Sequence, residues 1–186
     1  MKVIISDYKR YRYPIVSQGF WAGAIHRYGT FSRNTRFLPV RFPAKMLHFF
    51  LMKVSEMFLG VYIGPNARIG KAFLIEHTGC IVINSEARIG DYARIRHGVT
   101  IGNKIAEKPK DVPTIGDYID IGAGAKILGA ITIGNNVTIG ANAVVLRNVP
   151  DNSIAVGVPA RIIPKRNSSL SPEKFGNNNR PITTPW

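Results

Sequence analysis

The sequence predicts a mainly β protein whose central part is a solenoid of very short parallel strands. An aliphatic residue returns every six positions from Ile63 to Val145. The in-phase positions are Ile63, Ile69, Ile75, Ile81, Ile89, Ile95, Ile101, Ile115, Ile121, Ile127, Ile133, Ile139 and Val145. Eight of these isoleucines are followed directly by glycine. Helices repeat apolar residues every three or four positions and half-buried strands every two, so a period of six indicates a repeat array.

Each aliphatic residue of the repeat is expected to point inward and to stack on its counterpart one coil away, with three six-residue rungs in each coil. The period is interrupted twice. A two-residue slip falls at Val82-Ile83. The stretch from Lys104 to Thr114 carries three lysines and two prolines, and it is predicted to leave the coil as a protruding loop, where substrate contacts are often placed.

The first sixty residues differ in composition from the repeat, with ten Lys and Arg against Asp7 and Glu56. Apolar spacing predicts helices over residues 17–32 and 43–58, the second with Pro43 near its first turn. Their apolar stripes would form core or subunit contacts, or would lie on an anionic membrane surface. The predicted organisation is a basic helical segment (1–60), a β-helix (61–163) and a polar C-terminal tail (164–186).

The chain has a formal net charge of +14 and a pI near 10.3, which indicates an anionic partner such as a phosphate-bearing ligand or a membrane surface. No nucleic-acid-binding motif accompanies the charge, so nucleic acid is not an expected partner. A single cysteine, Cys80, excludes an intramolecular disulfide and fits a reducing compartment. With no signal-peptide pattern and no membrane-spanning apolar run, the expected location is the cytoplasm, including the inner face of the membrane.

Folding the rungs into coils of three places His77, His97, Ala123 and Ala141 in one column along an edge of the solenoid. The alanines would admit the thin arm of a thioester cofactor, and a histidine at the end of the groove would meet its carbonyl. Neutral imidazole, with a pKa of about 6.5, is a competent general base. The alternative is that neither histidine is catalytic, and that their rings only stack on each other and form hydrogen bonds with backbone carbonyls. No thiol or carboxylate cluster at ligand spacing accompanies them, so no metal site is predicted.

Three segments carry a family resemblance: residues 75–79 (IEHTG), 121–129 (IGAGAKILG) and 156–161 (VGVPAR). Over about residues 58–166 the chain resembles the hexapeptide-repeat acyltransferases, within the branch of serine acetyltransferases and exopolysaccharide O-acetyltransferases. The resemblance implies a left-handed parallel β-helix. It also implies acetyl-CoA as the acetyl donor and a homotrimer with each active site between two subunits.

The resemblance further implies roles for single residues. The histidine of the Glu76-His77 pair corresponds to the family's general base, although related sugar acetyltransferases place their base nearer His97. Ala123 and Ala141 correspond to residues that line the acetyl-CoA site, and Asn103 falls beside the cofactor. By their order in the chain, three basic residues are candidates to meet its phosphates: Arg147, Arg161 and Lys165.

Departures from the serine acetyltransferase pattern suggest a different acceptor. Tyr62 replaces the aspartate that partners the catalytic histidine, Glu76 replaces another aspartate, and Asp111-Val112 replaces an Arg-His pair. Residues 95–104 look instead like the colanic-acid and capsule enzymes. The expected function is therefore acetyl-CoA-dependent O-acetylation of a glycan hydroxyl in surface polysaccharide biosynthesis, with Tyr62 and Glu76 facing the acceptor. The alternatives are a serine O-acetyltransferase of cysteine biosynthesis and a non-catalytic binding scaffold.

Overall fold

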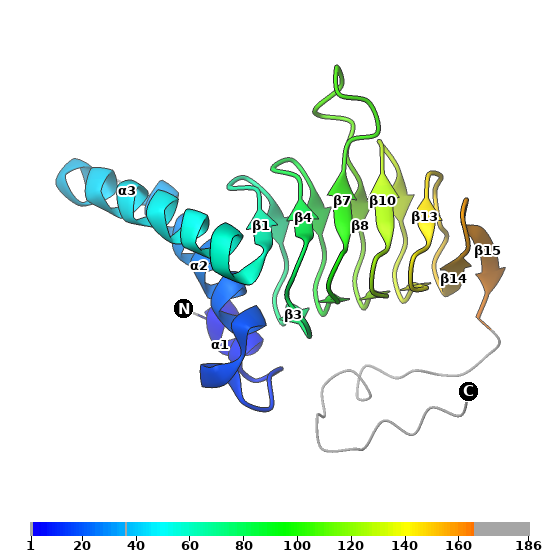
Figure 1. The fold of residues 1–186 in the computed structure, drawn as a ribbon, viewed down its shortest axis with the longest axis horizontal. Coiled ribbons are helices and arrows are strands. Elements are labelled where there is room, and N and C mark those ends of the chain that lie inside the picture. Colours follow the sequence, from blue (N-terminus) through cyan, green and yellow to red (C-terminus); the bar gives the residue numbers. More distant parts are fainter. Residues whose placement is uncertain (1, 36, 166–186) are drawn as a thin grey trace.

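The structure, a computed structural model, describes residues 2–35 and 37–165. A helical N-terminal part packs on one end of a stack of β coils (Figure 1). The helical elements are α1 (Lys2–Tyr8), the 3-10 turn η1 (Pro14–Val16), α2 (Gln18–Asn34), α3 (Leu38–Val54) and the π-helical turn η2 (Ser55–Leu59). The helical segment and the solenoid expected from the sequence are both present.

The strands form three sheets, which the chain visits in turn so that each regular coil contributes one strand to each sheet. Sheet A contains β1 (Val61–Ile63), β4 (Ile81–Ile83), β7 (Thr100–Gly102), β10 (Lys126–Leu128) and β13 (Val144–Val145). Sheet B contains β2 (Arg68–Ile69), β5 (Arg88–Ile89), β8 (Thr114–Ile115) and β11 (Thr132–Ile133). Sheet C contains β3 (Leu74–Ile75), β6 (Arg94–Ile95), β9 (Asp120–Ile121), β12 (Thr138–Ile139), β14 (Ser153–Val156) and β15 (Arg161–Pro164). The named strands pair in parallel, except that β15 closes the stack antiparallel to β14, so the predicted parallel β-helix is confirmed.

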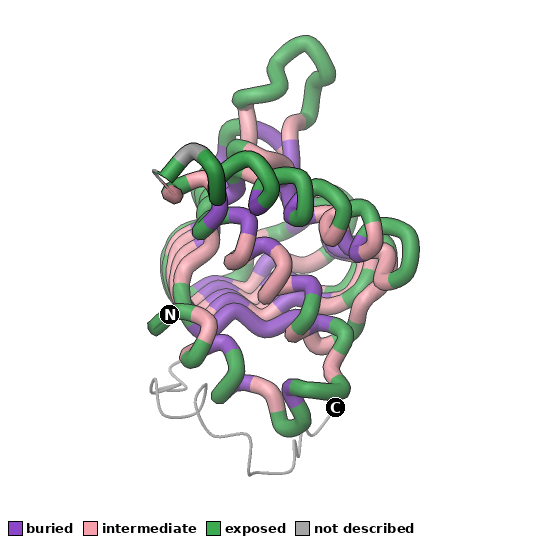
Figure 2. Tube along the Cα trace, turned by 90° about the vertical axis from the view of Figure 1, so that its left-hand side faces the viewer, coloured by how far each residue is buried: buried purple, intermediate pink, exposed green. Residues whose placement is uncertain are grey.

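The repeat isoleucines form the core, as their period predicts. In sheet C, Ile75, Ile95, Ile121 and Ile139 are register partners from coil to coil, and each is at most 1% exposed. Figure 2 shows the buried positions lining the inside of the stacked coils. The glycines that follow the isoleucines stand where coils approach closely. A Cβ added to Gly122 would lie 2.5 Å from the backbone nitrogen of the next coil, so a larger residue would push the coils apart.

Both interruptions of the period appear in the register. Val61 pairs with Ile81, and Val82 pairs with Thr100. Counted between these register partners, the first coil is therefore two residues longer than the second. The extra residues lie in the turn after β3 rather than at Val82-Ile83, because Ile81 and Ile83 both point inward from β4. The second interruption, residues 104–113, leaves the coil between β7 and β8 as the predicted loop (Figure 1).

The helices differ from the prediction in their limits. α2 closely follows the predicted range, but α3 begins five residues before Pro43, and Pro39 occupies its first turn instead. Pro43 lies inside the helix. The helix α1 was not predicted, because a seven-residue helix has too few turns to show a periodic apolar stripe.

The N-terminal helices satisfy the open edge of the first coil. Buried Asp7 accepts the backbone N–H of Phe73 (2.9 Å) and the Nε–H of Arg27 (2.9 Å). Arg27 also donates to the backbone carbonyls of Ile69 and Gly70. An edge strand left open would expose unpaired backbone groups and favour aggregation. The α1–α2 pair therefore acts as a cap on the solenoid.

The outer side of α3 carries exposed apolar side chains, namely Val40, Phe42, Met46, Leu47, Phe49 and Phe50. None of the helices in residues 2–35 and 37–165 is both long enough and apolar enough to cross a membrane. From residue 166 on, the polar tail predicted for 164–186 lies outside the described residues. The division of the chain into three parts stays a prediction.

Stability should fall at acid pH because of a buried histidine between the helices and the solenoid. Burial, together with the charges of Arg27 and Arg33, lowers the pKa of His26 to about 3. An unfolded histidine titrates near pH 6.5, so below that pH the unfolded state binds the extra proton and the free energy of unfolding falls, down to about pH 3. Between pH 6.5 and 5 the loss should be about 1–2 kcal/mol.

Urea unfolding at pH 7.5 and at pH 5.0 measures this effect, with His26→Gln as the comparison. The variant should show the smaller difference between the two pH values, while retaining the part due to His48, whose pKa burial also lowers. An equal pH dependence in both proteins would exclude His26 as the cause.

Candidate active site

The predicted column of histidines and alanines exists. His77, His97, Ala123 and Ala141 follow β3, β6, β9 and β12, whose register stacks them at the corner between sheets C and A. The coil-to-coil bonds continue along it, since the N–H of Gly124 donates to the carbonyl of His97 (2.9 Å). The rings of the two histidines lie edge to face, with centroids 6.2 Å apart. Both side chains are exposed, so an incoming substrate can reach either imidazole.

Small side chains continue the groove beyond the histidines. Ala123 is half-buried and Ala141 is exposed. The next residue of the column is Gly157, since β12 pairs with β14 in this register. Ala123, Ala141 and Gly157 have no side-chain atoms beyond Cβ, so the corner stays open along the backbone. Such an open corner suits a long thin ligand whose end lies at the imidazoles.

Glu76 takes part in a charged ladder across sheet C. Its carboxylate pairs with Arg96 (2.9 Å) and with Arg94 (3.5 Å), and Arg96 also donates to Asp120 (2.7 Å). Burial opposes the charge of Arg96, but the carboxylates of Asp120 and Glu76 outweigh it and raise the pKa of Arg96. The sequence reasoning missed Arg94, Arg96 and Asp120. The available signal was opposite charge at equivalent positions of neighbouring coils, namely Glu76 with Arg96 and Arg94 with Asp120.

Tyr62 and Asn103 lie together, but apart from the histidines. Both line a cavity of about 470 Å³ beside the protruding loop, with Asn84 and Lys110 among its other residues. The amide of Asn84 donates to Asn103 Oδ1 (3.1 Å). Within one protomer Asn103 and the histidine column lie at opposite ends of the strands of sheet A, because the turns after β3 and β6 precede those strands and Asn103 follows one of them.

Of the three basic candidates near the C-terminal end, Lys165 lies apart from the other two. Arg147 donates to the carbonyl of Ala160 (3.2 Å), and Arg161 is exposed on β15. Lys165 donates to the backbone and side-chain oxygens of Asn136, in the turn between β11 and β12, and burial lowers the pKa of Lys165. Lys165 therefore lies at a different corner from the alanines, between sheets B and C.

In the part of the chain that the structure describes, no three His, Cys, Asp or Glu side chains are grouped closely enough to hold a metal ion. The chemistry of the column is thus that of exposed imidazole beside an open groove. Such a group can accept a proton from a hydroxyl near neutral pH.

Comparison with known proteins agrees with this architecture. A profile described as "Bacterial transferase hexapeptide (six repeats)" matches residues 113–147. A serine acetyltransferase of Staphylococcus xylosus is 44% identical over 131 residues, which cover 70% of this chain and 60% of that protein. The crystal structure of Neisseria gonorrhoeae serine acetyltransferase superposes with a TM-score of 0.76 and 32% identity, covering 96% of this chain and 69% of that one. A serine acetyltransferase in complex with coenzyme A, from Brucella abortus, has a TM-score of 0.77 and 31% identity, covering 88% and 67%.

The coils and their histidine–alanine column define the class of β-solenoid transferases built from hexapeptide repeats. The chain belongs to the hexapeptide-repeat acyltransferase family, and the relatives compared above are serine acetyltransferases. The chain spans about 60% of the length of the first curated relatives that it matches.

The expectation of a glycan acceptor in surface polysaccharide biosynthesis is wrong, because these relatives and structures are serine acetyltransferases. Of the departures that suggested it, Glu76 directly precedes His77 of the column, whereas the others lie away from the histidines within one protomer. Asp111 and Val112 belong to the protruding loop, and Tyr62 lies on the outer side of sheet A. Substitutions at these places leave the column unchanged, so they are poor evidence for a change of acceptor.

Proposed function

We propose that the protein is a serine O-acetyltransferase that uses acetyl-CoA as its donor. The observation that carries the proposal is the column in which two exposed imidazoles are continued by Ala123, Ala141 and Gly157. The similarity to serine acetyltransferases over 70% of the chain supports serine as the acceptor. The complex of a similar enzyme with coenzyme A supports the donor.

In the proposed reaction His77 is the general base. Acetyl-CoA would supply the thioester carbonyl, held with its arm along the alanines. The imidazole of His77 takes the proton of the serine hydroxyl as the hydroxyl oxygen bonds to the acetyl carbon. The carbon–sulfur bond breaks, and the imidazolium returns the proton to the leaving thiolate. The products are O-acetylserine and CoA. Glu76 is held by Arg94 and Arg96, so its proposed role is to fix the turn that carries His77.

The groove proposal predicts the effect of a larger side chain at Ala141. We expect Ala141→Leu to raise the KM for acetyl-CoA by about tenfold and to change kcat little, because the added atoms would occupy the path of the arm. Ala141 is exposed, so the fold should tolerate the change. Steady-state kinetics against acetyl-CoA provide the measurement, with Ala130→Leu, also exposed but outside the column, as the matched control. An equal KM in the two variants would place the arm elsewhere.

A homotrimer is the proposed assembly. Asn103 and the histidine column lie at opposite ends of the sheet A strands, so a second copy that packs on this sheet would bring a loop end beside a histidine end. The proposed roles of Asn103 and Lys165 toward the cofactor would need a second copy in the same way. Arg161 differs, because it is the register partner of Val156, beside Gly157 of the column, and Arg147 donates to the carbonyl of the neighbouring Ala160. Sedimentation velocity tests the assembly, and a monomer at the concentration used for the activity assay would exclude it.

The direct test of the acceptor is release of CoA thiol from acetyl-CoA by the purified protein. L-serine is compared with D-serine, with a panel of sugars and with no acceptor. Release that depends on L-serine and yields O-acetylserine by mass spectrometry is the expected result. Release with none of the acceptors would overturn the assignment.

Contact of α3 with an anionic membrane surface stays a prediction. Exposed Arg41 and Lys45 accompany its exposed phenylalanines, and basic residues beside an apolar stripe favour a helix that lies on such a surface. Replacing Phe42, Phe49 and Phe50 by serine should reduce co-sedimentation with anionic vesicles. Equal sedimentation with and without vesicles would exclude the contact.

A further inference from the structure

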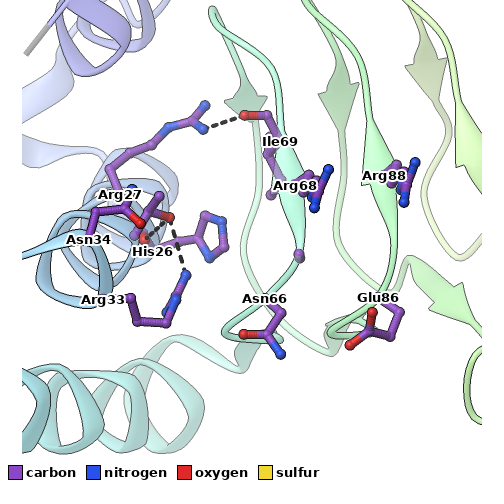
Figure 3. Close-up of a pocket in the computed structure, with 11 residues that line it drawn as sticks. His26, Arg27, Arg33, Asn34, Asn66, Arg68, Ile69, Glu86 and Arg88 are labelled. Atoms are coloured by element: carbon purple, nitrogen blue, oxygen red, sulfur yellow. Dashed lines mark hydrogen bonds between the residues drawn. The ribbon is translucent and has the colours of Figure 1, made fainter.

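A second cavity lies away from the histidine column, between α2 and sheet B. It has a volume of about 600 Å³ (Figure 3). Four arginines from three elements line it: Arg27 and Arg33 on α2, Arg68 on β2 and Arg88 on β5. Its size is within the range of small-molecule sites, and none of the residues assigned above to catalysis or to the acetyl donor lines it.

The strand arginines stand side by side. Arg68 and Arg88 are register partners in parallel strands, on neighbouring coils about 4.8 Å apart. Both are exposed, and neither forms an ion pair among the described residues. Two like charges at this spacing repel each other, and an anion held between them would remove the repulsion.

The helix arginine is poorly satisfied. Nη1 of Arg33 is buried without a hydrogen-bond partner in the described part of the chain, while Nη2 donates to Thr30 Oγ1 (3.3 Å). An unmade hydrogen bond of a buried charged group is costly. Burial also lowers the pKa of Arg33. Arg27, which lines the same cavity, differs because Asp7 and two backbone carbonyls already engage it.

We propose that this cavity binds a phosphate-bearing anion through Arg33, Arg68 and Arg88. A phosphate group has several acceptor oxygens, which planar guanidinium forks approach in pairs. Asn34 and Asn66 line the remaining wall with neutral amides, and Glu86 is the acidic residue of the lining. These groups suit hydroxyls of an organic part of the ligand. The proposal is independent of serine acetylation, because the site shares no residue with the column.

Isothermal titration calorimetry with sodium pyrophosphate at constant ionic strength tests the proposal. Binding should be saturable, about tenfold weaker in Arg33→Gln, and lost in the double variant R68Q/R88Q. The control is Arg12→Gln, an exposed arginine outside the cavity, which should bind as the unchanged protein does. This comparison also separates the cavity from basic residues near the proposed acetyl-CoA groove, which all variants retain.

A second arm distinguishes the source of the phosphate. Co-sedimentation with phosphatidylglycerol vesicles, compared with phosphatidylcholine, asks whether a lipid headgroup occupies the cavity. A free phosphate-bearing ligand is supported if R68Q/R88Q abolishes pyrophosphate binding and Arg12→Gln retains it. A lipid headgroup is supported if the protein binds vesicles but not pyrophosphate, and if R68Q/R88Q abolishes vesicle binding while Arg12→Gln retains it. Neither kind of binding, or equal binding by R68Q/R88Q and Arg12→Gln, overturns the proposal.

Discussion

His77→Ala should lower kcat/KM for serine acetylation by about 10² to 10⁴, which is the usual contribution of a general base. His77 is exposed at the end of the alanine groove, so its removal should take away the proton acceptor without disturbing the core. Binding of acetyl-CoA should persist, because the groove itself is unchanged. The measurement is CoA release with L-serine, together with the pH dependence of kcat/KM.

The control for this variant is His97→Ala, one coil further along the same column. The two rings are in contact, so His97→Ala should have a smaller effect and should keep the ionisation that limits the rate at low pH. In His77→Ala that ionisation should disappear from the pH profile. A larger loss in His97→Ala, with the low-pH limb kept in His77→Ala, would assign the general base to His97.

Asp7→Ala should destabilise the protein by about 3–5 kcal/mol, the cost of removing one partner of a buried ion pair. Asp7 is 5% exposed and holds both Arg27 and the N–H of Phe73. Its loss would leave the Arg27 guanidinium without its counter-charge and one edge N–H of the solenoid unpaired. Urea unfolding near pH 7.5 measures the change.

The matched control removes an exposed ion pair from the same helical segment. Lys53 and Glu56 are 2.7 Å apart, with side chains that are 49% and 43% exposed. Glu56→Ala should cost far less than Asp7→Ala, because water screens such a pair. If Asp7→Ala fails to fold, Asp7→Asn keeps a neutral acceptor for the Phe73 N–H and should fall between the two. Equal stability of Asp7→Ala and Glu56→Ala would show that the cap contributes nothing.

The repeat and the proposed catalytic column could be predicted from the sequence because both are periodic. Every coil uses the same rung, so a residue's phase determines its sheet, its corner and its vertical neighbours. The distance in sequence from Ile75 to Ile95 and from Ile95 to Ile121 was therefore enough to place His77, His97 and Ala123 on one line. The acceptor could not be predicted in this way, because the phase of the repeat places the two imidazoles but not the groups that would contact an acceptor.

Other features were decided only by tertiary packing. Asp7 meets Arg27 and Phe73, and Arg33 approaches Arg68 and Arg88, through helices whose position on the first coil follows no repeat. Gly19 allows α2 to pack closely on the first coil, since a Cβ at Gly19 would collide with the carbonyl oxygen of Ile75. The sequence by itself thus determined the solenoid and the residues of the histidine–alanine column, because their contacts recur with the period. The cap and the basic cavity depend on single contacts between distant segments, which only the folded chain brings together.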